Sequence, residues 1–147
     1  MSFTEDLLRT PSERTVGSRY TAWNGLIYLA LGILFILWPT SVQTLFRERA
    51  FAADEQGLFR VLGLAVVVIG WLYLFGGRAG GRQVVAASVI DRLIFVPAVL
   101  LPLAMAGVFP HVLVAFALLD MSLAVGAWVI LARTPTGART AAGLSPR

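Results

Sequence analysis

The chain lacks several residue types on which common catalytic and binding sites depend. It has no cysteine and a single histidine, His111. Disulfides, thiol redox chemistry, thiolate metal sites and a cysteine nucleophile are therefore excluded, and so is a histidine-rich metal site. The chain also has no glycine-rich phosphate loop and no hydrolase nucleophile elbow. The sequence thus predicts no catalytic residue, no metal and no cofactor, and it favours a protein that is not an enzyme.

Lysine is absent too, and charge is spread thinly along the chain. All twelve basic residues are arginines, and the formal net charge is +4. No Lys/Arg-rich run marks a nucleic-acid site, so nucleic acid is not an expected partner. Only 14% of the residues are charged and 58% are hydrophobic, against about 25% and about 45–50% in soluble domains. Much of the chain is therefore expected to contact lipid. Separately, heavy use of Ala, Gly and Arg without Lys is typical of a high-GC bacterial genome.

Long apolar segments set the expected fold. A helix needs about 20 residues to cross the apolar core of a bilayer, which is about 30 Å thick. Four segments have this length and form an expected transmembrane domain over residues 20–132, with spans at about 20–38, 57–75, 84–107 and 110–132. After the first span, Val42, Leu45, Phe46 and Arg49 follow at helical spacing and predict a short interfacial helix. The predicted fold class is all-α, a polytopic four-transmembrane-helix bundle with this short helix between its first two spans.

Capping and proline signals refine these segments. Residues 1–19 form an N-terminal segment without the pattern of a cleaved secretory signal. Within it, Thr10 to Glu13 resembles a capping box with Pro11 at the first helical position, which predicts a helix from about residue 11 into the first span. Thr40 with Gln43 resembles a second capping box. Pro97 and Pro102 predict a kinked third span, and residues 133–147 predict a disordered tail.

Arginines fall unevenly on the two sides of the expected membrane. With four spans, the N-terminal segment, the second loop and the tail share one side, which carries eight arginines against two on the other. The positive-inside rule places that side in the cytoplasm. We therefore expect a multi-pass protein of the cell inner (cytoplasmic) membrane with both termini cytoplasmic. Aromatic residues near the span ends predict interfacial belts: Trp23, Trp38, Trp71 and Tyr73.

Glycines recur at a spacing of seven residues in the first two spans. Gly25 and Gly32 lie in the first, and Gly63 and Gly70 lie in the second. Small residues on one helix face let two backbones approach closely, which drives helix association in lipid. We interpret the four glycines as helix-packing positions, with an internal repeat as the weaker alternative.

Three ionisable residues lie deep in the last two spans. Asp120 lies ~15 Å from one end of its span, and Arg92 lies roughly 12 Å into the third span, next to Asp91. The alanines at helical spacing around Asp120 predict that its face meets another helix. These positions predict a polar cluster of Asp91, Arg92 and Asp120. One interpretation is a buried ion pair that fixes the helix register; the other is a polar site for a ligand or a proton.

Two further polar residues lie near the non-cytoplasmic ends of the second and fourth spans. Arg60 and His111 are candidates for a shared cavity on the external side. The simpler interpretation is that Arg60 reaches the interface, or pairs with Asp54 or Glu55, while His111 is solvated in the first turn of its helix.

Short motifs in three spans resemble one family of small bacterial membrane proteins. They are Phe59-Arg60-Val61-Leu62-Gly63, Ile90-Asp91-Arg92-Leu93-Ile94-Phe95-Val96-Pro97 and Phe116-Ala117-Leu118-Leu119-Asp120. With the four-span layout, they make about residues 20–131 similar to the BphX-like family, within the broader DoxX-like group of four-helix membrane proteins. The resemblance implies a bacterial membrane location and no assigned activity. Some DoxX-like proteins are membrane subunits of quinone-linked oxidoreductases, although nothing in this sequence marks a quinone site.

Three functions remain open at this point. The favoured one is a non-enzymatic membrane protein that binds an apolar small molecule or stabilises a partner membrane protein. The second is a membrane subunit of a quinone-linked oxidoreductase. The third is a small transporter for protons or aromatic compounds; its few spans argue against it, although a homo-oligomer would supply more helices.

Overall fold

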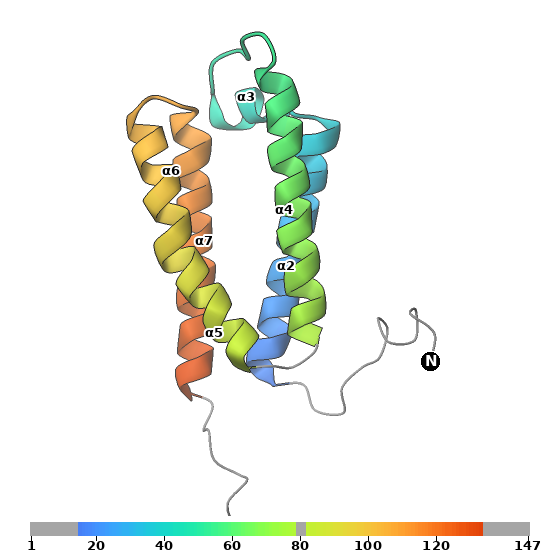
Figure 1. Cartoon of the computed structure of the whole chain (residues 1–147), viewed down its shortest axis with the longest axis vertical. Coiled ribbons are helices and arrows are strands. Elements are labelled where there is room, and N and C mark those ends of the chain that lie inside the picture. Colours follow the sequence, from blue (N-terminus) through green and yellow to red (C-terminus); the bar gives the residue numbers. More distant parts are fainter. Residues whose placement is uncertain (1–14, 79–81, 134–147) are drawn as a thin grey trace, which may run out of the picture.

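The fold is known from a computed structural model, which describes residues 15–78 and 82–133. In this part of the chain, every regular element is a helix, and four helices are long and apolar enough to cross a membrane. The predicted four-helix bundle is thereby confirmed (Figure 1). In chain order the elements are α2 (Val16–Leu37), α3 (Ser41–Phe46), α4 (Glu55–Arg78), α5 (Arg82–Ile90), the π-helix η1 (Asp91–Phe95), α6 (Val96–Met105) and α7 (Pro110–Arg133).

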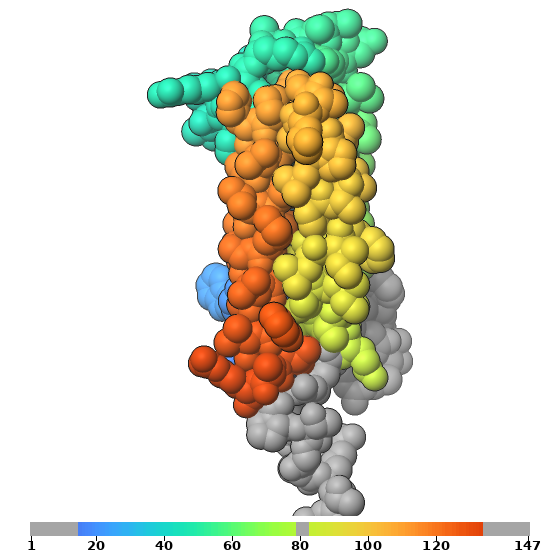
Figure 2. All heavy atoms as spheres, turned by 90° about the vertical axis from the view of Figure 1, so that its left-hand side faces the viewer, coloured from blue at the N-terminus to red at the C-terminus, as the bar shows by residue number. Residues whose placement is uncertain are grey.

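The outer surface of the bundle is apolar along all four long helices. Large apolar side chains are exposed on each of them, including Leu37, Leu72, Phe95 and Leu118. A soluble monomer rarely exposes apolar patches of this extent. The exposed surface therefore fits contact with lipid acyl chains, and Figure 2 shows α6 and α7 side by side along one flank, below the segment that follows α2.

The start of α2 differs from the predicted helix that would run unbroken from about residue 11. Thr15 is extended, and its Oγ1 accepts a hydrogen bond from the N–H of Ser18 at 3.1 Å. This is a side-chain N-cap, so α2 begins at Val16. The predicted capping box at Thr10 to Glu13 lies outside the described residues, and so does the predicted disordered tail beyond Arg133.

Helix α2 packs against α4 through its glycines. A β-carbon added to Gly32 would lie 2.6 Å from the carbonyl oxygen of Gly63, and one added to Gly70 would lie 2.6 Å from the backbone nitrogen of Leu29. Gly25 faces Gly70 and Leu74 in the same interface. All four predicted packing glycines thus lie where the two backbones touch, which gives close van der Waals contact along both helices.

The segment between α2 and α4 closes one end of the bundle. Helix α3 is present where a short helix was predicted, but the Thr40 side chain makes no capping bond and the helix ends at Phe46, before Arg49. The carboxylate of Glu48 instead accepts a hydrogen bond from the N–H of Val112 at 2.8 Å. Because the first N–H groups of a helix lack partners within it, this bond caps α7 and ties the segment to it.

The third span is irregular where prolines follow in the sequence. Helix α5 ends at Ile90, η1 continues with a wider turn, and the N–H of Val96 donates to the carbonyl of Asp91, five residues earlier. Pro97 has no N–H, and its ring crowds the carbonyl of Leu93, so a regular α-helical turn is disfavoured there. The predicted kink therefore takes the form of a π-helix that contains Asp91 and Arg92.

The glycine interface generates a stability prediction. We expect Gly70→Ala to lower the free energy of unfolding by about 1–3 kcal/mol, because the added methyl overlaps the α2 backbone. The measurement is denaturant unfolding in detergent micelles. The matched control is Gly57→Ala in the same helix, where an added methyl meets nothing within 4 Å and should stabilise by about 0.5–1 kcal/mol. Equal effects of both substitutions would contradict the packing role.

Candidate functional site

A cavity of about 290 Å³ lies between two pairs of helices. One pair is α2 with α4, and the other is the third span with α7; the two pairs diverge above α5 (Figure 1). The wall is mostly apolar, with Val66 and Ile69 from α4 and Val96 and Leu100 from α6. Four aromatic and two acidic side chains also line the cavity: Tyr28, Tyr73, Phe95, Phe116, Asp91 and Asp120.

The cavity is open between α4 and the third span. Four of its large apolar lining residues are exposed: Leu62 at 41% and Ile69 at 37% on α4, Phe95 at 63% in η1 and Val99 at 58% on α6. They come from the two helix pairs and flank the opening between α4 and the third span. Exposed apolar side chains of α4 and α6 surround this opening, and such a surface fits contact with lipid.

Asp120 forms the polar end of the cavity on α7. Its side chain is only 3% exposed, and its Oδ1 has no hydrogen-bond partner among the described residues. Ala117, Ala124 and Ala127 around it are fully buried, as the prediction of a helix-facing surface requires. A buried polar atom without a partner is costly, so Asp120 has unused hydrogen-bonding capacity at the cavity wall.

Arg92 is buried against aromatic rings. The residue is 1% exposed, and its guanidinium carbon lies 4.3 Å from the ring centroid of Tyr73 and 5.1 Å from that of Tyr28. These distances are within the range of cation–π attraction. Within the described part of the chain, none of its three side-chain nitrogens has a hydrogen-bond partner.

Asp91 is held by a tyrosine from the other helix pair. The hydroxyl of Tyr73 donates a hydrogen bond to Oδ2 of Asp91 at 2.9 Å. Both residues line the cavity, and both also line a second pocket of about 290 Å³ between α4 and α5, together with Ser88. The Tyr73–Asp91 bond therefore lies at the boundary between the two pockets.

The predicted polar cluster differs from the observed one in how its members interact. Among the described residues, no ion pair within 4.0 Å joins Arg92 to Asp91 or Asp120. Arg92 contacts the rings of Tyr28 and Tyr73 instead. The sequence analysis missed both tyrosines and placed Tyr73 in an interfacial belt. The available signal was helical spacing, because Tyr28 follows the buried Thr21 and Asn24 by seven and four residues on one face of α2.

Arg60 and His111 do not share a cavity in the part of the chain described. Arg60 is exposed and lines a shallow pocket with Asp54, without forming an ion pair there. Glu55, its other predicted partner, pairs with Arg49. His111 is exposed, and its Nδ1 lies 3.6 Å from the carboxylate of Glu48, the group that caps α7.

Comparison with known proteins finds no relative of this chain. None of the protein-family models, curated proteins or solved structures compared with the chain matches it. The resemblance to BphX-like and DoxX-like proteins therefore stays a prediction.

Over the described residues, no group of three His, Asp or Glu side chains is arranged to hold a metal ion. What the cavity can do chemically is bind an apolar molecule and offer it a hydrogen bond.

Burial of Arg92 without a carboxylate partner generates the second prediction. We expect Arg92→Met to leave the free energy of unfolding unchanged or to raise it, because burying a charge costs more than burying an apolar chain of similar size. Arg92→Ala should be about 2–5 kcal/mol less stable than the methionine variant, since it leaves a void. Thermal and denaturant unfolding in micelles measure both. Equal destabilisation by the two substitutions would show that the cation itself holds the fold.

Proposed function

We propose that this chain is a small integral membrane protein that binds an apolar small molecule taken up from the bilayer. The observation that carries the proposal is the mostly apolar cavity between the helix pairs, whose lining includes Asp120 with no partner for its Oδ1 among the described residues. Ligand sites are typically concave and mostly apolar, with a few placed polar groups. Nothing in this role requires turnover, so the proposed protein is a binding or accessory protein and not an enzyme.

The lining indicates the class of ligand. A cavity of about 290 Å³ is at the lower limit for drug-sized ligands, so it suits a single substituted ring better than a large molecule. Four aromatic side chains offer edge and face contacts to such a ring. Asp120 would bind one hydrogen-bonding substituent. A small phenol with an apolar substituent has all of these features.

Location and orientation are part of the same proposal. The termini of the described chain lie at one end of the bundle, and α3 lies at the other (Figure 1). The eight-to-two arginine bias supports a cytoplasmic position for the first of these ends. We assign the protein to the inner membrane of a bacterium, in line with its resemblance to BphX-like proteins.

Transport of such molecules is the second candidate, favoured by the two pockets that meet at Tyr73 and Asp91. If that bond opened, the central cavity would join the pocket beside α5. Flux of a small phenol across liposomes that contain the protein, at a rate that rises in Tyr73→Phe, would favour transport. Binding without flux would favour the first candidate. A quinone retained by gently extracted protein would instead favour a redox subunit.

The lateral opening generates the third prediction, with 4-butylphenol as the probe. We expect Val99→Trp to weaken binding about tenfold, because a larger side chain fills the opening. Val61→Trp is the matched control, since Val61 is similarly exposed on α4 and does not line the cavity. Titration followed by native mass spectrometry measures both affinities. An unchanged affinity in Val99→Trp would exclude this entry route.

The polar end generates the fourth prediction. The wild-type protein should bind 4-butylphenol about tenfold more tightly than butylbenzene, which has the same apolar body and no hydroxyl. In Asp120→Leu the preference should disappear, because leucine has a similar size and offers no hydrogen bond. Both ligands binding equally to the wild type would contradict the role of Asp120, whereas loss of both in the variant would indicate a damaged fold.

A further inference from the structure

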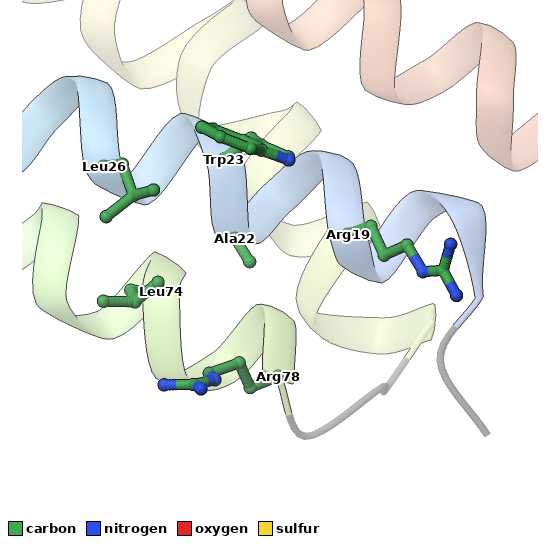
Figure 3. A pocket seen from close by; sticks show the side chains of 6 residues that line it. All are labelled: Arg19, Ala22, Trp23, Leu26, Leu74 and Arg78. Carbon is green, nitrogen blue, oxygen red and sulfur yellow. The ribbon is translucent and has the colours of Figure 1, made fainter. Parts of the chain in front are cut away.

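A further pocket, distinct from the two described above, lies at the end of the α2–α4 pair. It has a volume of about 490 Å³ and six lining residues: Arg19, Ala22, Trp23, Leu26, Leu74 and Arg78. Figure 3 shows the first four on α2 and the last two on α4. None of these residues lines the central cavity. The pocket belongs to the end of the bundle where α2 begins and where α4 and α7 end (Figure 1).

The glycine interface brings the first turns of α2 beside the last turn of α4. Gly77 packs directly on α2, where an added β-carbon would lie 2.6 Å from the backbone nitrogen of Ala22 and 2.8 Å from the carbonyl oxygen of Ser18. Arg19 follows Ser18, and Arg78 follows Gly77. The same close packing that joins the helices therefore anchors both arginines at one groove, from which their side chains extend in different directions (Figure 3).

The pocket carries positive charge that the described residues do not neutralise. No carboxylate lines it, and neither Arg19 nor Arg78 forms an ion pair within the described ranges. Arg49, at the opposite end of the bundle, is bound by Glu55 through two hydrogen bonds. The charge of the pocket by Arg19 and Arg78 therefore suits an anionic ligand.

The rest of the lining indicates where that anion is attached. Ala22, Leu26 and Leu74 give the groove an apolar floor that continues along the spans. Trp23 is exposed beside them, and tryptophan is typical of the headgroup level of a membrane. A small hydrophilic anion would gain nothing from this floor. An amphiphile with an anionic head and apolar chains would contact every part of the lining.

We infer that this pocket binds an anionic phospholipid, with its phosphodiester between Arg19 and Arg78. The planar guanidinium groups would donate paired hydrogen bonds to the phosphate oxygens. An acyl chain would lie along Leu26 and Leu74, and the ring of Trp23 would rest against the glycerol region. Basic pockets between transmembrane helices are a recognised way to bind acidic headgroups. The inference does not depend on the apolar ligand proposed for the central cavity.

The test is lipid titration of delipidated full-length protein in detergent, followed by native mass spectrometry. Phosphatidylglycerol and phosphatidylcholine of identical acyl chains are the two probes. The wild type should bind phosphatidylglycerol more tightly. Arg19→Gln and Arg78→Gln should each weaken that binding about fivefold, and the double variant about 25-fold. Affinity for phosphatidylcholine should change little.

The control removes the same charge elsewhere. Arg47→Gln with Arg133→Gln takes two exposed arginines that do not line the pocket, and it should leave phosphatidylglycerol binding within about twofold of wild type. An equal loss in this control would reduce the effect to general charge and overturn the site. Displacement of the lipid by millimolar glycerol phosphate alone would overturn the lipid as ligand in favour of a soluble anion. Unchanged helical circular dichroism in each variant verifies that the fold is intact.

Discussion

The backbone contact between α2 and α4 is the constraint from which the other features follow. Glycines on both helices remove the side chains that would separate them, so van der Waals contact extends along the whole pair. The third span packs on α7, and α7 contacts α2. Among the described helices, α4 has no comparably close partner on its other side. The two pairs are thus joined mainly through α2 and α7. The cavity lies on the other side, between α4 and α6.

The π-helix contains two of the polar residues that the sequence analysis singled out. Asp91 lies at the cavity wall and Arg92 lies over the tyrosine rings. The cause of the wider turn lies in Pro97, which disturbs the hydrogen-bond ladder one turn earlier. π-Helical turns occur frequently at functional sites. Here the irregular turn and the polar residues coincide, which links the proline in the sequence to the chemistry of the cavity.

The sequence predicted the features that depend on local pattern. Apolar length indicated the four spans, and glycine spacing indicated which faces of the first two would be available for close contact. It missed the tyrosines around Arg92, because a tyrosine near a span end is equally typical of an interfacial belt. It also missed the cap of α7 by Glu48, which joins residues 64 positions apart. Such long-range contacts depend on how loops fold over the bundle, and no local spacing encodes them.

The separation of Arg92 from Asp120 has a chemical consequence for the cavity. An ion pair between them would have saturated the carboxyl group and given a rigid strut between the last two spans. The rings of Tyr28 and Tyr73 instead attract the cation and leave Asp120 without a partner for Oδ1. Stability alone would favour the pair or an apolar replacement. An Asp120 with no partner for Oδ1 at the wall of an apolar cavity is instead the arrangement that the proposed binding of a molecule from the bilayer requires.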